Sequence, residues 1–211
     1  MQTYYAARAP EYDRVYLKPE RQTDLRAIEA WVRTQFSGAS VLEIACGTGY
    51  WTQFIAQAAT CVRATDLAPE TLDIAKARVT RPHVEFMIGD AYTPAQYTGQ
   101  FDGAFAGFWF SHVPIARRDE FLSTLNAALS PGAKVVLLDN RYVEGSSSAI
   151  ADHDADGNTY QLRTLGDGTT HRVLKNFPSK EELVSLAHRA GQDARVVEWQ
   201  YYWALEYVTA T

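Results

Sequence analysis

The chain has 211 residues, of which 46% are hydrophobic and 21% charged, a composition typical of one globular domain with a substantial core. Its net charge of -5 argues against a nucleic-acid-binding protein, and no signal peptide or membrane-spanning run is apparent. The two cysteines, Cys46 and Cys61, provide no disulfide framework and indicate a reducing compartment, so we expect a cytoplasmic protein.

Residues 1–38 are expected to form an amino-terminal helical lid. Tyrosines are frequent in the segment from Tyr4 to Tyr16, although its apolar residues show no clear period. After Pro19, apolar residues recur at helical spacing as far as Ser37-Gly38, which is a stop signal. The pattern predicts a helix over about residues 20–36 that leads into the first strand.

Residues 40–139 alternate between strand and helix patterns and are expected to form a cofactor-binding core. Continuous apolar runs are typical of strands buried on both faces of a parallel sheet. A helix face is expected from Trp51 to Ala58, Pro69 suits the start of a second helix, and Ser130-Pro131-Gly132 is expected to close a third. Five strands separated by helices predict a doubly wound α/β sheet. The expected strands cover residues 41–46, 61–66, 84–88, 101–106 and 134–138.

Residues 140–177 are expected to form a loop and hairpin insert after the fifth strand. The first part, residues 140–158, is polar and loop-like. Two strand-like segments, 159–165 and 170–177, flank Gly166-Asp167-Gly168, which predicts a β-hairpin with a glycine turn.

Residues 178–211 are expected to close the domain with one helix and two strands. Ser179 and Glu182 form a capping-box pattern at the start of the helix, and Gly191 is expected to stop it. The strands, at residues 194–199 and 203–208, are expected to finish the sheet as an antiparallel pair. No repeat or linker divides the chain, so residues 1–211 are interpreted as a single domain.

A strand, a glycine turn and the start of a helix follow one another directly between Val41 and Tyr50. Glycines such as Gly47 and Gly49 permit positive φ and close approach of a ligand, and a helix amino terminus attracts anionic groups. In an open α/β sheet the ligand lies at the carboxyl ends of the strands. Asp66, which ends the second strand, is placed to accept hydrogen bonds from a ribose diol, and Asp90 ends the third strand near an adenine amino group.

Two classes of nucleotide cofactor compete for this site. A dinucleotide-binding turn needs the pattern G-x-G-x-x-G, and Thr52 stands where its third glycine belongs. This departure weakens the case for a nicotinamide-dependent oxidoreductase.

The pattern Glu43-x-Ala45-x-Gly47-x-Gly49 instead resembles motif I of the class I S-adenosylmethionine-dependent methyltransferases, with Ala45 where glycine is usual. The resemblance continues along the chain: residues 65–70 are similar to motif II, residues 89–91 to motif III, and the segments around 101–102 and 129–132 also match. It implies a Rossmann-like fold with seven strands in the order 3-2-1-4-5-7-6, strand 7 antiparallel, and S-adenosyl-L-methionine as the cofactor.

The resemblance also implies roles for individual residues in holding the cofactor. Gly47 and Gly49 would lie at its methionine end with Glu43 nearby, Leu67 would pack on the adenine, and Phe108 would cover the sulfonium. The expected cofactor-binding residues are Tyr12, Glu43, Ala45, Gly47, Gly49, Asp66, Leu67, Asp90, Ala91 and Phe108.

The segment after the fourth strand, Gly107 to His112, lacks the Asn/Asp-Pro-Pro-Tyr/Phe signature of enzymes that methylate amino groups in DNA. With the acidic net charge, its absence favours a small-molecule acceptor. His112 and Asp139 are candidate catalytic residues, His112 as a general base or simply as a structural histidine. Arg141 would suggest a carboxylate or phosphate on the acceptor. The expected substrate-binding residues are Tyr4, Tyr5, Trp109, Asn140, Arg141 and Tyr160.

Residues 152–157 imitate the first half of a calcium-binding loop. The bidentate glutamate required at the twelfth position is Arg163 here, so we expect no calcium site, and no Cys/His spacing suggests zinc.

We therefore expect a methyltransferase that acts on an oxygen or nitrogen of a small molecule, as a monomer or homodimer, without nucleic-acid or membrane partners. Two alternatives stay open. One is non-methyl chemistry with the same cofactor, such as cyclisation of its aminobutyl chain, and the other is a non-catalytic binding protein.

Overall fold

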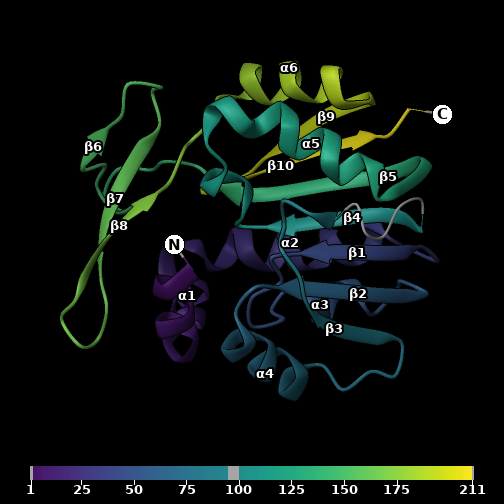
Figure 1. The fold of residues 1–211 in the computed structure, drawn as a ribbon, viewed down its shortest axis with the longest axis horizontal. Coiled ribbons are helices and arrows are strands. Elements are labelled where there is room, and N and C mark those ends of the chain that lie inside the picture. The colour runs from purple at the N-terminus through teal and green to yellow at the C-terminus, as the bar shows by residue number, and fades with distance from the viewer. Residues whose placement is uncertain (1, 95–99, 211) are drawn as a thin grey trace.

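The computed structural model describes residues 2–94 and 100–210, and its centre is one seven-stranded sheet (Figure 1). The strand order is β3-β2-β1-β4-β5-β10-β9, with β10 antiparallel to both of its neighbours. The expected order and the antiparallel seventh strand are thus confirmed. The strands are β1 (Ser40–Ile44), β2 (Cys61–Asp66), β3 (Val84–Ile88), β4 (Phe101–Gly107), β5 (Leu129–Asn140), β9 (Gln192–Glu198) and β10 (Tyr202–Val208).

Helices cover both faces of the sheet, so the doubly wound architecture is also confirmed (Figure 1). On one face, Leu125 and Leu186 of α5 and α6 pack with Leu137 of β5. On the other, Ile28 of α2 packs with Val136, because successive side chains of a strand point to opposite faces. The helices are α2 (Gln22–Gln35), α3 (Thr52–Ile55), α4 (Pro69–Arg78), α5 (Arg118–Ala127) and α6 (Lys180–Ala190).

Two elements differ from the pattern that the sequence predicts. Helix α3 is a single turn, because the backbone around Ala58 is already hydrogen-bonded to the chain before β1: Gly38 N donates to the Ala58 carbonyl at 2.8 Å. Strand β5 begins at Leu129, five residues early, and pairs there with Phe101. Its register against β4 then shifts, and Gly132, with a φ of +77°, lies within this irregularity. The glycine that suggested a helix end therefore belongs to a bulged strand.

The amino-terminal lid and the insert lie beside each other at one end of the sheet (Figure 1). The lid consists of α1 (Gln2–Arg8) and the 3₁₀ helix η1 (Ala9–Tyr16), followed by η2 (Pro19–Arg21). The insert contains the predicted hairpin, and the segment expected to be a loop also supplies a short strand. These strands, β6 (Asp152–His153), β7 (Thr159–Thr164) and β8 (Thr170–Leu174), form a separate antiparallel sheet.

The closing helix α6 has the predicted capping box at its start. Ser179 Oγ accepts the backbone N–H of Glu182 at 3.2 Å, and the Glu182 carboxylate accepts that of Ser179 at 2.7 Å. Gly191 ends the helix in an extended conformation, and a Cβ there would lie 2.2 Å from the Val208 carbonyl oxygen. Glycine is required for the close approach of β10.

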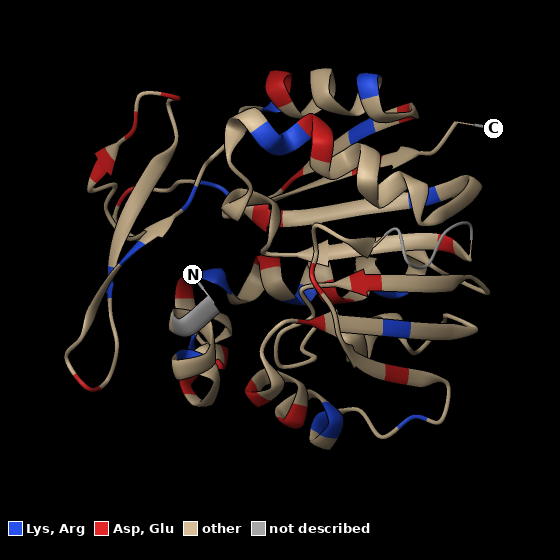
Figure 2. Ribbon diagram, viewed as in Figure 1, with Lys and Arg blue, Asp and Glu red and all other residues tan. Residues whose placement is uncertain are grey.

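Acidic and basic residues are interspersed over the helices and strand ends (Figure 2). Among the helices that the structure describes, none has the length and apolar composition needed to cross a membrane.

Candidate active site

A cavity of about 250 Å³, which we call the smaller cavity, lies beyond the carboxyl ends of β1, β2 and β3. Eight of the ten residues expected to bind the cofactor line it, although they are distributed between residues 12 and 108. They are Tyr12, Ala45, Gly47, Asp66, Leu67, Asp90, Ala91 and Phe108.

The turn after β1 is tied to the end of β2 by Asp66. One carboxylate oxygen accepts the N–H of Gly47 at 2.9 Å, and the other accepts that of Ala68 at 2.9 Å. The Asp66 side chain lines the cavity. Burial raises the pKa of Asp66 above its usual value. This arrangement presents a fixed carboxylate to ligand hydroxyl groups.

The backbone of the turn is left-handed at both Ala45 (φ +51°) and Gly47 (φ +55°). Glycine adopts this conformation freely, whereas alanine is strained in it. The conformation explains why the related motif usually has glycine at the position of Ala45.

The opposite wall of the smaller cavity suits a flat ring. Leu67 and the aromatic side chains of Tyr92 and Trp109 line it, with the two ring centroids 5.9 Å apart. Asp90 is held by its own loop, since its Oδ1 accepts the N–H of Tyr92 at 2.9 Å. Trp109, expected to bind substrate, thus lies on the smaller cavity.

The two remaining expected cofactor residues, Glu43 and Gly49, do not line the cavity. Glu43 is buried within β1, its Oε2 has no hydrogen-bond partner, and burial, with a smaller effect of the Asp66 charge, raises its pKa to about 8. Gly49 has a φ of +74°, and a Cβ there would lie 3.0 Å from the Cβ of Ala75. The structure thus places Gly49 against α4.

The lid is attached to the same turn by Asp13. Its carboxylate accepts the hydroxyl of Thr48 at 2.6 Å and forms an ion pair with Arg78 of α4. Arg78 also donates to the Thr48 carbonyl at 2.8 Å. These contacts fasten the lid to the turn after β1, next to Gly47, which lines the smaller cavity.

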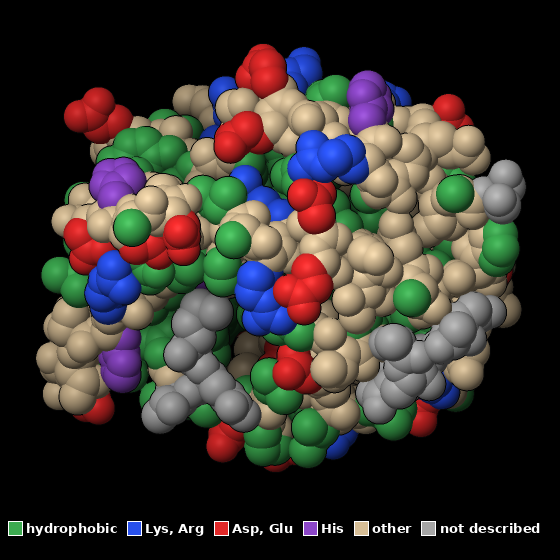
Figure 3. Space-filling model, turned by 45° about the horizontal axis from the view of Figure 1, so that its top comes forward, with side chains coloured by type: hydrophobic (Ala, Val, Ile, Leu, Met, Phe, Trp, Pro, Cys, Tyr) green, Lys and Arg blue, Asp and Glu red, His purple; other side chains and the backbone are tan. Residues whose placement is uncertain are grey.

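The larger cavity, about 410 Å³, lies between the lid, the loop after β5 and the β6–β8 sheet. In the space-filling view the surface is hollowed between that sheet and the main body (Figure 3). Four residues line both cavities, which therefore meet there: Tyr5, Tyr12, Phe108 and His112. We call these four the passage residues. Phe108 is left-handed, with a φ of +61°, and its ring stacks on those of Tyr16 and Tyr202.

His112 is buried and held at both ring nitrogens. Nδ1 lies 2.5 Å from the Leu174 carbonyl oxygen, and Nε2 lies 2.8 Å from the Tyr5 hydroxyl. A carbonyl can only accept, so Nδ1 carries the proton and Nε2 accepts the Tyr5 hydroxyl. Burial, followed by the cations of Lys175 and Arg163, keeps the pKa of His112 well below its usual value. His112 is therefore neutral near pH 7.

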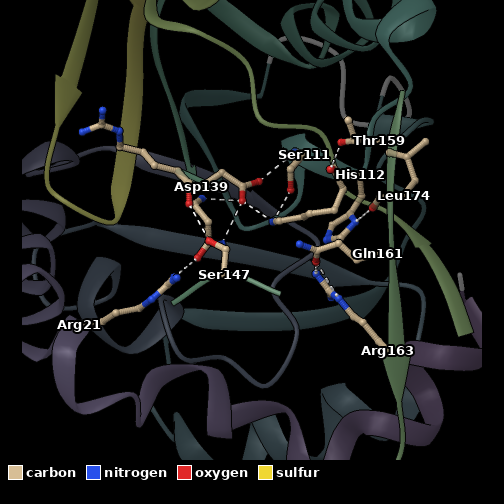
Figure 4. Close-up of polar contacts among 12 residues, drawn as sticks. Arg21, Ser111, His112, Asp139, Ser147, Thr159, Gln161, Arg163 and Leu174 are labelled. Carbon is tan, nitrogen blue, oxygen red and sulfur yellow. Dashed lines mark hydrogen bonds and ion pairs between the residues drawn. The ribbon is translucent and has the colours of Figure 1, made fainter. Parts of the chain in front are cut away.

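Asp139 lies behind the larger cavity at the centre of a buried network (Figure 4). Its carboxylate accepts Lys175 Nζ at 2.7 Å, and the N–H groups of Ser111 and Asn140 at 2.9 and 2.7 Å. Burial alone would raise the pKa of Asp139, but the Lys175 ammonium keeps it below its usual value. Asp139 acts here as the counter-ion of Lys175, which lines the cavity.

The wall of the larger cavity is rich in cations. Glu11, the acidic residue among the described residues of this wall, forms an ion pair with Arg14 at 3.3 Å. Four further cations have no carboxylate within ion-pair distance among residues 2–94 and 100–210: Arg8, Lys18, Arg21 and Arg163. Sequence reasoning placed Arg163 in the insert expected to roof the acceptor pocket. It missed Arg8, Lys18, Arg21 and Lys175, because no local motif links cations spread between residues 8 and 175.

The other expected substrate residues divide into two groups. Tyr4, Tyr5 and Asn140 line the larger cavity. Arg141 instead donates to the Trp199 carbonyl at 2.9 Å and pairs with Glu198, and the Tyr160 hydroxyl donates to Asp154 at 2.8 Å. The structure does not bring Arg141 or Tyr160 to either cavity.

The calcium-like segment is folded on itself. Asp154 Oδ1 accepts the N–H groups of Asp156 and Asn158, and Asp152 pairs with Arg172. Within the described part of the chain, no group of three or more His, Cys, Asp or Glu side chains is arranged to hold a metal ion.

The chain is similar to known proteins in both sequence and structure. The family described as a methyltransferase domain matches residues 41–132. A ubiquinone biosynthesis O-methyltransferase from Xanthomonas euvesicatoria pv. vesicatoria (strain 85-10) is 28% identical over 174 residues, which are 81% of this chain and 69% of the relative.

Solved structures are similar over almost the whole chain. A DhpI–SAH complex is 30% identical, with a TM-score of 0.77, and covers 97% of this chain and 93% of DhpI. A DhpI–SAM–HEP complex is 29% identical, with a TM-score of 0.80, and covers 97% of this chain and 94% of DhpI. The [4+2]-cyclase SpnF, 14% identical with a TM-score of 0.68 and coverage of 100% and 95%, shares the fold alone.

Proposed function

The chain belongs to the class I S-adenosylmethionine-dependent methyltransferases, and we propose that it methylates an oxygen atom of a small anionic molecule bound in the larger cavity. The observation that carries the proposal is the meeting of the two cavities at the passage residues. A methyl donor held on one side would face an acceptor held on the other.

The residues around the smaller cavity fit S-adenosylmethionine. Asp66 offers carboxylate oxygens for the ribose hydroxyls, Leu67 and Trp109 flank a slot for the adenine, and the left-handed turn at Gly47 leaves room beside its backbone. When bound, the cofactor supplies an electrophilic methyl group on a sulfonium. The protein's task is then to orient the acceptor and exclude water.

The anionic character of the acceptor is supported by the cations of the larger cavity. A buried or half-buried cation without a counter-ion is unfavourable, so four such groups around one cavity favour an anionic ligand. The same cations disfavour an ammonium acceptor, which supports oxygen over nitrogen as the methylated atom. The curated relative compared above is likewise named an O-methyltransferase.

We further propose that the nucleophilic oxygen arrives already ionised. The low pKa of His112 makes it a weak base near pH 7, and Asp139, neutralised by Lys175, lines neither cavity. A carboxylate or phosphate-type oxygen needs no base, because it carries no proton to remove.

The test is turnover with a panel of small acids, matched with neutral alcohols and amines of the same carbon skeleton. We expect acids alone to give a methylated product together with S-adenosylhomocysteine, both identified by mass spectrometry. Formation of methylthioadenosine would instead support cyclisation of the aminobutyl chain, and methylation of amines alone would overturn the proposal.

A matched pair of variants tests the site itself. Arg163→Gln removes a cation from the cavity and should lower kcat/KM for the acid about tenfold or more, since hydrogen bonds to charged groups contribute roughly 1.5–3 kcal/mol. Arg141→Gln removes a cation that lies outside both cavities, and this variant should have an unchanged kcat/KM for the acid. Equal effects would contradict the placement of the acceptor.

The remaining expectations are also proposals. We propose that the enzyme acts as a monomer or homodimer in the cytoplasm, consistent with its free cysteines, Cys46 and Cys61. Light scattering after size-exclusion chromatography tests the oligomeric state, and a larger assembly would overturn it.

A further inference from the structure

We propose that the acceptor carries a second anionic group, which binds Lys18 and Arg21 on the wall of the larger cavity opposite Arg163. The inference rests on the proposed function and narrows the acceptor to a molecule with anionic groups at two ends. It follows from how the unpaired cations are grouped, from their burial and from the size of the cavity.

The four unpaired cations form two pairs, each defined by what it contacts. Arg8 donates to the Tyr4 hydroxyl at 2.8 Å, and Arg163 lies 3.4 Å from the Tyr5 hydroxyl, so this pair belongs to the lid and the hairpin next to the passage residues. The other pair, Lys18 and Arg21, converges on Ser146 in the loop after β5. Lys18 Nζ donates to the Ser146 carbonyl, and Arg21 Nε donates to Ser146 Oγ at 2.9 Å.

Arg21 is the most constrained member of the second pair. Its side chain is buried, its guanidinium carbon lies 5.1 Å from the centre of the Tyr201 ring, and its Nη1 donates to Asn140 Oδ1 at 2.8 Å. These partners fix the guanidinium without neutralising it. The nearest acidic residue along the chain, Glu20, is exposed and accepts the Ser146 hydroxyl at 2.6 Å instead of pairing with Arg21.

Lys18 lies beside this fixed charge. Burial lowers the pKa of Lys18 and the neighbouring Arg21 cation lowers it further, against a smaller opposing effect of the Glu20 carboxylate. Two like charges in a partly buried wall repel each other, and an anion bound between them would relieve this repulsion. Ser147 and Ser148 continue the same wall and add hydroxyl groups.

The two pairs lie on different walls. In the close-up, Arg21 lies to the lower left of the buried network around Asp139, and Arg163 lies to its lower right (Figure 4). At about 410 Å³, the cavity falls in the range of sites for whole small molecules, which is far more than one carboxylate needs. An acceptor with one anionic group would therefore leave one pair of cations without a counter-ion.

The experiment compares acids that differ only in the second charge. Calorimetry on the S-adenosylhomocysteine-loaded protein would measure the Kd of valerate against glutarate, and of propylphosphonate against 3-phosphonopropionate. We expect the doubly charged member of at least one pair to bind about tenfold or more tightly. Lys18→Met should remove that advantage and leave the affinity of the singly charged member unchanged.

Two further variants keep the result interpretable. Arg14→Gln is the matched control, because Arg14 lines the same cavity but is already paired with Glu11, so the advantage should persist. Arg21→Gln should abolish the advantage, provided that thermal unfolding shows a folded variant. Equal weakening of both acids by Lys18→Met, or no advantage in the unaltered protein, would overturn the second site.

The outcomes for the two proposals are distinguishable. Binding and methylation of singly charged acids without any gain from a second charge would overturn this inference alone. Failure of every acid to bind the S-adenosylhomocysteine-loaded protein would overturn the anionic acceptor and, with it, both proposals.

Discussion

The hydroxyl of Tyr5 lies 2.8 Å from Nε2 of His112, and this contact joins the lid to the segment that follows β4. Because the Leu174 carbonyl takes the other ring proton, Tyr5 has to donate. Both residues line both cavities. A single hydrogen bond thus joins the lid to the segment after β4 at the place where the two cavities meet.

A double-mutant cycle on Tyr5→Phe and His112→Asn should give a coupling energy of about 1 kcal/mol, the usual net contribution of a buried hydrogen bond. Urea unfolding of the S-adenosylhomocysteine complex measures it. Tyr16→Phe paired with His112→Asn is the control, because the Tyr16 ring stacks on Tyr50. If the effects of Tyr5→Phe and His112→Asn on the unfolding free energy are additive, the two side chains do not form this hydrogen bond.

Asp66→Ala should weaken S-adenosylhomocysteine binding at least tenfold, or about 1.4 kcal/mol, because it removes the carboxylate that faces the smaller cavity. Calorimetry measures the affinity. Asp73→Ala, which removes an exposed carboxylate from α4, should bind the cofactor normally. Unchanged affinity in a folded Asp66→Ala protein would disprove the ribose assignment.

Ala45→Gly should raise the free energy of unfolding by about 1 kcal/mol, because the left-handed conformation at φ +51° is strained for alanine and not for glycine. Denaturant unfolding tests this. The same change at Ala30, exposed within α2, should instead lower stability by about 1 kcal/mol. A loss of stability at both positions would show that the turn is not strained.

Glu43→Gln should change how stability depends on pH. The folded protein holds the Glu43 proton up to a pKa of about 8, against 4.5 for an ordinary glutamate, so the folded state binds more protons between these values. The stabilisation from this group is complete below about pH 4.5 and is lost as the pH rises to about 8, by at most about 1.4 kcal/mol per pH unit.

Unfolding free energies should therefore be measured from pH 5 to pH 8. As the pH rises, the stability of Glu43→Gln relative to that of the unaltered protein should increase. Glu144→Gln, at an exposed position in the loop after β5, serves as the control and should not reproduce this trend. A constant difference for Glu43→Gln would mean that Glu43 is ionised throughout.

The parts of the fold that could be predicted depend on local patterns. The β1 turn, Asp66 and Asp90 each lie at the carboxyl end of a strand, and the order of the parallel strands then brings them to one edge of the sheet. The short strand β6 and the extension of β5 were missed. Their pairing is decided by neighbours, β7 and β4, and not by their own residues.

The larger cavity shows more clearly what local sequence patterns cannot predict. Lys175 meets Asp139 across 36 residues, and Arg21 meets Ser146 across 125. Such pairs leave no spacing to read in a sequence. Arg141, the cation that the sequence favoured for its place after β5, instead bonds the backbone at Trp199.

The lid has a practical consequence for work with this enzyme. Its first helix starts at Gln2, and Tyr4 and Tyr5 already contribute to the larger cavity, whereas the carboxyl end lies at the far side of the sheet (Figure 1). An affinity tag fused before Gln2 would emerge beside the entrance for the acceptor. A tag after the last strand would leave that entrance clear and is the better choice for kinetics and crystallisation.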